Sequence, residues 1–189
     1  ILSDNEVNFE VKVENVVASV TINQKIDLQK IIVKFPHTEY DPKRFPGLIY
    51  KLKQPKTAIL VFASGKMVVT GARSEKEAYL AVSVIIKSLM SKKILTNPET
   101  NVKIQNVVAS GNLFGEIDLE LAASILDSCM YEPEEFPGLI YQMYDPKVVI
   151  LIFASGKIVC TGAKKEKEVS VAVRKLSLEL QDKELILYF

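Results

Sequence analysis

Two kinds of hydrophobic spacing alternate along this chain, and each predicts a different element. Residues 7–22 alternate as a strand does, with Val13 and Val17 on one face and Val16 on the other. The segment after Ser74 instead places its apolar residues three and four apart, as in an amphipathic helix. The chain is therefore predicted to mix strands with helices.

The same spacings divide the rest of the chain into elements. Pro36 ends the first helix, and Ser74 with Glu77 forms a capping box at the start of the second. The links between the central strands are too short for crossovers, which predicts antiparallel pairing. The predicted strands cover residues 7–22, 48–53, 57–63, 66–72, 102–113, 139–144, 148–154 and 157–163. The predicted helices cover residues 26–35, residues 117–130, the segment that starts at residue 74, and a closing segment with Val169, Ala172, Val173, Leu176 and Leu180. The apolar segment 185–189 is not assigned to a helix or a strand.

The whole pattern occurs twice. The segment Phe-Pro-Gly-Leu-Ile-Tyr at residues 45–50 returns at 136–141, an offset of 91 positions that needs no gap. The same offset aligns Phe-Ala-Ser-Gly-Lys at 62–66 with 153–157. A period this long indicates a duplicated half-domain rather than a solenoid. We predict two repeat halves, residues 1–96 and 97–189, that share one core about a pseudo-two-fold axis.

Composition narrows the class of protein. The 189 residues are 48% hydrophobic and 25% charged, which is typical of a globular protein, and the net charge of +1 gives no bulk attraction for a polyanion. No apolar run is long enough to span a bilayer, and no signal peptide is evident. Cys129 and Cys160 lack metal-ligand spacing and are expected to be buried thiols, and His37 is expected to be a solvated loop residue. No metal or cofactor is predicted.

Strands that are apolar on both faces point to a binding surface. Residues 57–62 and 148–153 have apolar side chains on both faces, yet each half has only enough helix to cover one. The other face should stay uncovered in the free protein. A face of this kind marks a ligand site or the surface of a second subunit, so it could also pair with itself when no ligand is present.

The polar residues around this face favour the minor groove of a bent duplex. Asn15, Asn106, Thr70 and Thr161 are matched neutral groups, and apolar side chains around them leave no partner for a guanine amino group, which favours A·T pairs. The matched phenylalanines at loop and strand positions suit wedges between base steps. These are Phe45, Phe62, Phe136 and Phe153, and the basic residues at the strand ends are Arg44, Lys51, Lys66, Arg73, Lys157 and Lys164.

These segments resemble those of the TATA-box-binding proteins, which are general transcription factors. The resemblance covers nearly the whole chain and is carried by Glu-Pro-Glu-Glu-Phe-Pro-Gly-Leu-Ile-Tyr at 132–141, Tyr-Asp-Pro-Lys-Arg-Phe at 40–45 and both Phe-Ala-Ser-Gly-Lys segments. This family is a standard example of minor-groove wedging and of β-sheet recognition of DNA, so the two interpretations are not independent. The closeness of the two halves looks more like the archaeal branch.

The resemblance implies a fold and a set of residue roles. The implied fold class is α+β: a saddle of two pseudo-symmetric repeats in which a curved antiparallel sheet carries helices on its convex face. The phenylalanines would form two kinking pairs, 45 with 62 and 136 with 153, and the basic residues named above would meet phosphates. Asn15, Asn106, Thr70 and Thr161 would bond base edges, and Val17, Val108, Leu60, Leu151, Val68 and Val159 would make apolar contacts.

The two halves differ in ways that bear on partners. Gln142 occupies the position that matches Lys51, where the family usually has a basic residue, and Glu14 matches Gln105. The second loop carries glutamates where the first has Lys43 and Arg44, and an acidic loop attracts a basic protein surface. In the family this loop docks transcription factor B, and RNA polymerase follows indirectly. The candidate partner contacts are therefore Glu132, Glu134 and Glu135.

The function predicted from the sequence is a non-enzymatic initiation factor on TATA-box promoters. It would act in the cytoplasm at the archaeal nucleoid, or in the nucleus if the source is a eukaryote. The alternative is a carrier of an apolar small molecule on a curved sheet, which also needs an uncovered face but has no use for two matched phenylalanine pairs. An enzyme is not favoured, because no Cys–His pair, carboxylate pair in a cleft or phosphate-binding glycine loop is present in the sequence.

Overall fold

The computed structural model describes residues 7–189, so the first six residues of the predicted first repeat half lie outside the described residues. The chain forms two compact units. Glu14–Asn106 is the first-repeat unit, and Val107–Phe189 with residues 7–13 is the second-repeat unit. The division falls inside β1 (Glu10–Ile22) and β5 (Thr100–Asn112), so each of these strands contributes to both units.

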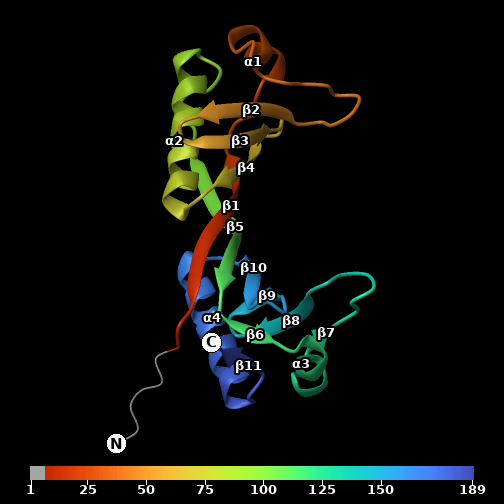
Figure 1. Cartoon of the computed structure of the whole chain (residues 1–189). Coiled ribbons are helices and arrows are strands. Elements are labelled where there is room, and N and C mark those ends of the chain that lie inside the picture. The colour runs from red at the N-terminus through yellow and green to blue at the C-terminus, as the bar shows by residue number, and fades with distance from the viewer. Residues whose placement is uncertain (1–6) are drawn as a thin grey trace, which may run out of the picture. The chain divides into compact units, whose positions relative to one another are not determined.

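The first-repeat unit is one helix layer on an antiparallel sheet. Its hydrogen-bonded strand order is β2-β3-β4-β1-β5, and the pairs β2–β3, β3–β4 and β4–β1 are antiparallel. The long helix α2 packs along one face of this sheet (Figure 1). The elements besides β1 and β5 are α1 (Leu28–Lys34), β2 (Leu48–Lys53), β3 (Lys56–Val61), β4 (Lys66–Ala72) and α2 (Glu75–Ser91).

The second-repeat unit repeats this plan and adds a small second sheet. Its main sheet has the order β5-β10-β9-β8-β7, and α4 packs against β10. Strand β11 pairs with β6 in the two-stranded sheet, with Ile186 opposite Ile117. The elements besides β5 are β6 (Gly115–Ile117), α3 (Leu119–Ile125), β7 (Cys129–Met130), β8 (Leu139–Tyr144), β9 (Lys147–Ile152), β10 (Lys157–Ala163), α4 (Glu166–Asp182) and β11 (Ile186–Tyr188).

Strand alternation places one set of apolar side chains under the long helix of each unit. Ile59 and Val69 are fully buried in the first-repeat unit, as are Ile150 and Ile152 in the second. The helical spacing predicted most of the helix residues that are buried, but Ile86 of α2 is only half-buried, and Ser177 of α4 is buried without having been predicted. Buried on α2 are Ala78, Ala81, Val82, Ile85 and Leu89, and buried on α4 are Val169, Ala172, Val173, Leu176, Ser177 and Leu180.

The serine half of the predicted capping box at the start of α2 is confirmed, whereas the Glu77 side chain binds the amide of the residue before the cap rather than that of Ser74. The Glu77 backbone N–H donates to the Ser74 hydroxyl oxygen at 3.0 Å, and the Glu77 carboxylate accepts from the Arg73 backbone N–H at 2.8 Å. The serine contact satisfies one of the amides that the first turn cannot pair internally, and the glutamate contact fixes the residue before the cap. At α4 the cap residue is Lys165, which makes no side-chain cap bond, so only the carboxylate of Glu168 remains, accepting from the Lys164 N–H at 2.9 Å.

The predicted helix at 117–130 was wrong in both boundaries. The chain first forms β6, then the short helix α3, and then β7. The Asp118 side chain starts the helix by accepting from the Leu121 N–H at 3.0 Å. Ser128 has a left-handed φ of 54°, so a right-handed helix cannot continue through it to residue 130. Pairing between segments explains the difference, because β6 is held by β11, which lies far along the sequence, and β7 is held by the nearby strand β8.

Smaller boundary differences have local causes. The predicted strands 57–63 and 148–154 end earlier, because residues after Val61 and Ile152 enter the tight turns before Lys66 and Lys157. The first helix begins at Leu28 because the Asp27 side chain accepts from the amides of residues 29 and 30. The first strand begins at Glu10, the fifth strand spans Thr100–Asn112, and the unassigned segment 185–189 contains β11.

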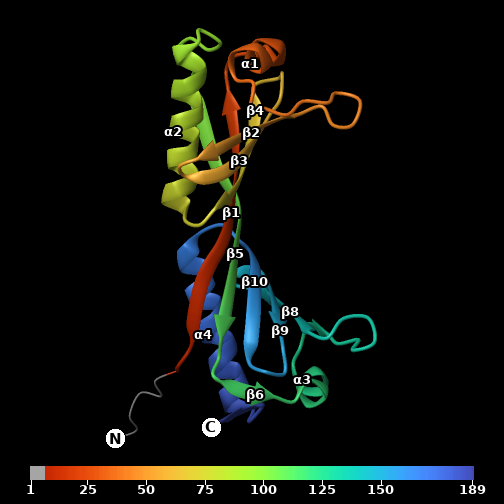
Figure 2. The same ribbon diagram turned by 45° about the horizontal axis from the view of Figure 1, so that its top comes forward.

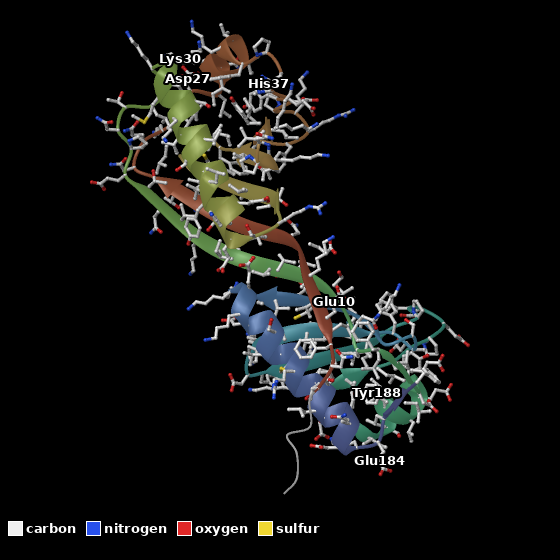
Figure 3. All side chains as sticks on the ribbon, turned by 60° about the vertical axis from the view of Figure 1, so that its left-hand side comes forward. Glu10, Asp27, Lys30, His37, Glu184 and Tyr188 are labelled. Carbon is white, nitrogen blue, oxygen red and sulfur yellow. The ribbon has the colours of Figure 1, made fainter. Side chains whose placement is uncertain are left out.

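The lone histidine is exposed, as predicted. His37 lies in the loop after α1, and Tyr188 lies on β11 (Figure 3). The His37 ring packs edge-on against Tyr50, with 5.0 Å between ring centroids. Among residues 7–189, no helix combines the length and apolarity needed to cross a bilayer.

A charged cluster ties α4 to its sheet in the second-repeat unit. The Tyr141 hydroxyl donates to Glu179 Oε2 at 2.7 Å, and Lys183 Nζ donates to Glu179 Oε1 at 2.9 Å. Burial alone would raise the pKa of Glu179, but the hydrogen bonds from Tyr141 and Lys183 outweigh it, so its pKa is lowered. Burial, then the bond to Glu179, raise the pKa of Tyr141. In the first-repeat unit the matching residues are Tyr50 and Ser88, so no carboxylate stands there.

We expect Glu179→Gln to lower the free energy of unfolding at neutral pH by about 1 kcal/mol, because a charged acceptor is replaced by a neutral one at a half-buried site. A carboxyl whose pKa is lowered by folding stabilises the fold above its unfolded pKa, and that stabilisation is lost as the pH falls through the folded pKa. Urea unfolding from pH 7 down to pH 3 should therefore show a shallower acid loss in the variant than in the wild type.

The matched control is Ser88→Ala in the first-repeat unit, which removes a neutral group at the equivalent position. Its stability should follow the wild-type pH profile. An acid limb in Glu179→Gln that is as steep as the wild-type limb would show that the carboxylate does not couple folding to protonation.

Candidate nucleic-acid interface

Each sheet has a second face that the long helix does not bury. In the first-repeat unit Leu60 lies opposite Val68, and in the second-repeat unit Leu151 lies opposite Val159. These side chains are half-buried, whereas their neighbours on the helix side are fully buried. We call this the open face. Its predicted site residues are Asn15, Val17, Leu60, Val68 and Thr70 in the first-repeat unit and Asn106, Val108, Leu151, Val159 and Thr161 in the second.

The open face is half-buried rather than bare, which refines the prediction of an uncovered surface. The flat cross-strand packing of β-branched and leucine side chains covers part of each one. What remains is accessible to solvent at every residue of the set. Each unit thus presents an apolar floor whose side chains need no movement before they can meet a ligand.

The Asn15 side chain has a fixed orientation. Its Oδ1 accepts from the Gly71 backbone N–H at 2.7 Å, and its Nδ2 donates to the Thr70 hydroxyl at 3.4 Å. A bulge in the pairing of β1 with β4 and a φ of +88° at Gly71 bring that amide to the asparagine. Because Oδ1 is engaged by backbone, the group left to face a ligand is the amide NH₂. Asn15 is therefore a donor at this position.

The second-repeat unit has the same backbone device. Gly162 has a φ of +95°, and the pairing of β10 with β5 shifts register between Cys160 and Ala163. Asn106 and Thr161 are both half-buried at the matching positions. The two units therefore offer the same neutral polar pair beside the same apolar floor.

The four predicted phenylalanines form two edge-to-face pairs. Phe45 and Phe62 have ring centroids 5.7 Å apart at an interplanar angle of 70°, and the second-repeat pair is at 5.9 Å and 66°. Phe45 is 41% exposed, and Phe62, Phe136 and Phe153 are half-buried. None of the four is interred in the core. The loops that carry the first member of each pair extend on the side away from α2 and α4 (Figures 1 and 2).

A glycine beneath each pair sets the position of its rings. A Cβ on Gly47 would lie 2.6 Å from the Phe45 ring, and a Cβ on Gly138 would lie 2.8 Å from the Phe136 ring and 3.1 Å from Phe153. Both glycines are required for space rather than for backbone conformation, since neither has a left-handed φ. This role was not predicted from the sequence, although both glycines recur within the repeated segment.

The predicted basic residues are all exposed, but two of them already have acidic neighbours. Lys51 Nζ lies 2.9 Å from Glu39 Oε1, and Arg44 Nε lies 3.6 Å from Asp41 Oδ2. Such exposed ion pairs contribute little stability and exchange easily. The acidic partners were missed because they lie in a loop whose path the sequence does not fix. The remaining basic residues of the predicted set, also exposed, are Lys66, Arg73, Lys157 and Lys164.

The two loops have one backbone design with opposite charges. In the first, the amides of Arg44 and Phe45 both donate to the Asp41 carbonyl at 3.0 Å. In the second, the amides of Glu135 and Phe136 donate to the Glu132 carbonyl at 3.0 and 2.9 Å. The predicted partner residues Glu132, Glu134 and Glu135 are all exposed. The same turn therefore displays cations in one unit and carboxylates in the other.

The cysteines take no part in this surface. Cys160 is buried, and burial raises its pKa to about 11. Burial, then the charge of Asp127, raise the pKa of Cys129, which is half-buried. Both are therefore protonated thiols at neutral pH. Over the described range 7–189, no group of His, Cys, Asp and Glu side chains could hold a metal ion.

A family model described as transcription factor TFIID, or TATA-binding protein, matches residues 10–92 and, separately, residues 101–183. The chain belongs to the TATA-binding protein family. The two matches start 91 positions apart, which is the offset of the internal repeat. This is a family of transcription factors, the class that the sequence predicted in place of an enzyme.

Archaeal TATA-box-binding proteins are similar to this chain over most of their length. The protein of Pyrobaculum neutrophilum is 51% identical over 171 residues, which cover 90% of this chain and 87% of the relative. That of Sulfurisphaera tokodaii is 52% identical over 166 residues, covering 88% and 84%. The solved structure of Methanococcus jannaschii TBP matches with a TM-score of 0.81 at 44% identity, over 92% of this chain and 99% of that one. These matches confirm the α+β fold class predicted from the sequence.

The glycine beneath each ring pair can be tested directly. We expect Gly138→Ala to displace the Phe136 ring and to lower the free energy of unfolding by about 1–3 kcal/mol, because the new methyl group has no room under the ring. Aromatic NMR shifts of Phe136 and Phe153 would report the displacement, and urea unfolding the cost.

The matched test is Gly138→Ala in a Phe136→Leu background, where the smaller side chain leaves room for the methyl group. The alanine should then cost much less than it does beside phenylalanine. An equal cost in both backgrounds would show that the glycine is needed for a reason other than the ring above it.

Proposed function

We propose that this protein is an initiation factor that binds the minor groove of A·T-rich TATA-box promoter DNA and kinks it with its two phenylalanine pairs. The observation that carries the proposal is the pair of edge-to-face phenylalanines beside the open face of each unit, each seated on a glycine. Apolar wedges that partly unstack base steps are the characteristic device of minor-groove binding, for which this family is itself the standard example. The names of the archaeal relatives support the same assignment.

The open face suits the floor of an A·T minor groove. That groove presents only acceptors at A·T pairs, namely adenine N3 and thymine O2, while G·C pairs add the guanine amino donor. The NH₂ of Asn15 is a donor aimed away from the backbone amide that holds its Oδ1. A guanine amino group against Leu60 or Val68 would lose its water and gain no partner, at a cost of about 1–3 kcal/mol. Selectivity for A·T pairs would follow.

The residues proposed for each role are those predicted from the sequence. Apolar contacts would come from Val17, Leu60 and Val68 with their repeat equivalents, and donors or acceptors from the asparagine and threonine pairs. A phosphate arriving at Lys51 or Arg44 would replace an exposed carboxylate at little cost. The proposed phosphate contacts are Arg44, Lys51, Lys66, Arg73, Lys157 and Lys164.

The acidic loop of the second-repeat unit is the proposed docking site for transcription factor B. Glu132, Glu134 and Glu135 are exposed at a turn whose counterpart in the first repeat carries cations. A basic surface of the factor would meet these carboxylates, and RNA polymerase would be recruited through it. The repeat halves 1–96 and 97–189 would each supply one wedge. The protein would act where the genome lies, which is the nucleoid in an archaeal cell or the nucleus in a eukaryotic one, and could self-associate through the open face when no DNA is bound.

A carrier of an apolar small molecule is the weaker interpretation. One ligand of that size needs one hollow lined by apolar side chains. It has no use for matching aromatic pairs, matching asparagines and matching bulges in two separate units. A duplex, whose two strands are themselves related by approximate two-fold axes, can use both sets.

We expect Phe153→Ala to weaken binding to a TATA duplex by roughly tenfold and to reduce the DNA bend, because the wedge loses one ring. The ring is half-buried, so the free energy of unfolding should fall by less than the 3–5 kcal/mol typical of a fully buried phenylalanine. Fluorescence energy transfer across end-labelled DNA would report the bend, and circular dichroism the fold.

The control is Phe189→Ala, which removes an aromatic ring that is 93% exposed and outside the proposed interface. It should leave both bend and affinity unchanged. A Phe153→Ala protein that folds normally and bends DNA fully would overturn the wedge role, and equal affinity for A·T-rich and G·C-rich duplexes would overturn minor-groove recognition altogether.

We expect Glu134→Lys with Glu135→Lys to weaken recruitment of transcription factor B by at least roughly tenfold while leaving TATA binding intact, because the charge that attracts the factor is reversed. Gel shifts with and without the factor would separate the two effects. The reciprocal control is Lys43→Glu with Arg44→Glu in the first loop, which should weaken DNA binding instead. Undiminished recruitment by the glutamate variant would exclude this loop as the docking site.

A further inference from the structure

A hollow of about 910 Å³ lies in the second-repeat unit, and neither ring of the phenylalanine pair lines it. It is formed by the hairpin that joins β8 to β9, by the end of β10 and by the first turns of α4. Two large apolar side chains at its edge are open to solvent, Tyr144 at 72% exposed and Val171 at 39%. Its size lies within the range of about 300–1,000 Å³ that binding pockets usually have.

The rim of the hollow is cationic. Four lysines line it, Lys147, Lys164, Lys165 and Lys167, against two carboxylates. Both carboxylates already have partners within the chain. Glu168 accepts from the Lys164 backbone N–H at 2.9 Å, and Asp145 accepts from Lys175 Nζ, at 2.6 Å through its carbonyl and 3.4 Å through its side chain. With four lysines and two carboxylates among its lining residues, the hollow carries a net positive charge.

The repeat shows that this combination is particular to the second half. At the offset of 91, Tyr144 corresponds to Lys53, Lys165 to Ser74 and Asp145 to Gln54. Three of the four rim lysines keep a basic equivalent in the first half, namely Lys56, Arg73 and Lys76, so the difference lies in Tyr144, Asp145 and Lys165. In the second half an exposed aromatic ring and an added lysine occur together.

We propose that this hollow binds a short acidic segment of a partner protein that carries at least one large apolar side chain. The apolar side chain would enter between Tyr144 and Val171, and carboxylates beside it would meet Lys165 and Lys167. Complementary charge would speed the encounter, and burial of the apolar anchor would hold the complex. This site goes beyond the proposed function, since it is neither the phenylalanine surface nor the acidic loop, and of the residues that line it Lys164 alone is also a proposed phosphate contact.

The chemistry of the hollow favours a peptide over flanking DNA. A phosphate backbone would contact the lysines alone and would make no use of the apolar surface of Tyr144 and Val171. A peptide that alternates carboxylates with apolar side chains uses both the rim and the apolar edge. The two occupants therefore predict different effects when the exposed aromatic ring is removed.

The test titrates the full chain with a short synthetic peptide in which aspartates alternate with phenylalanine and leucine. Affinity would be measured by fluorescence anisotropy, and the location by amide shifts in α4 and the β8–β9 hairpin. Lys165→Glu with Lys167→Glu should weaken binding at least roughly tenfold, and Tyr144→Ala severalfold. Both variants should fold, because these residues are exposed and glutamates at the start of a helix favour it.

Matched controls sharpen the result. Lys76→Glu, the first-repeat equivalent of Lys167, should leave peptide binding unchanged, and a peptide with serines in place of phenylalanine and leucine should bind much more weakly. Bending of a TATA duplex should be retained in all these variants, so that a failure here is distinguishable from failure of the proposed function.

Four results would overturn the proposal. One is equal binding of the serine peptide, and another is no binding of the apolar one. A third is binding of a random-sequence duplex to this surface that only the lysine variant loses, which would assign the surface to flanking DNA. The fourth is self-association by sedimentation that the same variants abolish, which would assign it to a second copy of the chain.

Discussion

The structure depends on strands that are apolar on both faces while only one face is covered by helix. In each unit the long helix buries side chains such as Ile59 and Ile150 completely, and the residues between them along the strand must point the other way. Leaving such a face in water costs about 25 cal/mol for each Å². Close cross-strand packing reduces that cost, because Leu60 and Val68 cover part of each other. The remaining exposure is what a ligand can relieve.

The polar groups on this face are fixed by backbone geometry rather than by side-chain chemistry alone. Asn15 could present either an acceptor or a donor, and the bulge at Gly71 decides the matter by engaging Oδ1. The phenylalanine pairs are fixed in a similar way, since Gly47 and Gly138 let the rings lie directly on the backbone. Preorganised groups of this kind spend little conformational entropy on binding. Under the proposed function the protein bends DNA, and a rigid floor suits that task because the protein should not deform before the duplex does.

The sequence predicted those parts of the structure that depend on local spacing. Strand alternation, helical spacing and the Ser74 capping box place the longer strands and the two long helices, but not β6, β7 or β11, and the repeat offset pairs the candidate asparagines, threonines and phenylalanines with their equivalents. The helix predicted at 117–130 failed because β6 is held by β11, some 70 residues further along the chain. The contact between Lys51 and Glu39 and the hollow beside Tyr144 were unpredictable for the same reason. Each depends on two segments whose approach no local spacing encodes.

Duplication explains how one fold can treat its two halves alike at the floor and differently at the rim. The turn that presents Phe45 has the same pair of amide-to-carbonyl bonds as the turn that presents Phe136. Since those bonds are made by the backbone, the exposed side chains beside them are free to diverge, and they have done so in sign: Lys43 and Arg44 in one half, Glu134 and Glu135 in the other. The Tyr50–Ser88 and Tyr141–Glu179 positions diverge in the same manner within a conserved frame. A floor with equivalent residues in both halves discriminates poorly between the two directions along a duplex. Under the proposed function, direction must therefore come from the diverged positions, which are those that face phosphates and partner proteins.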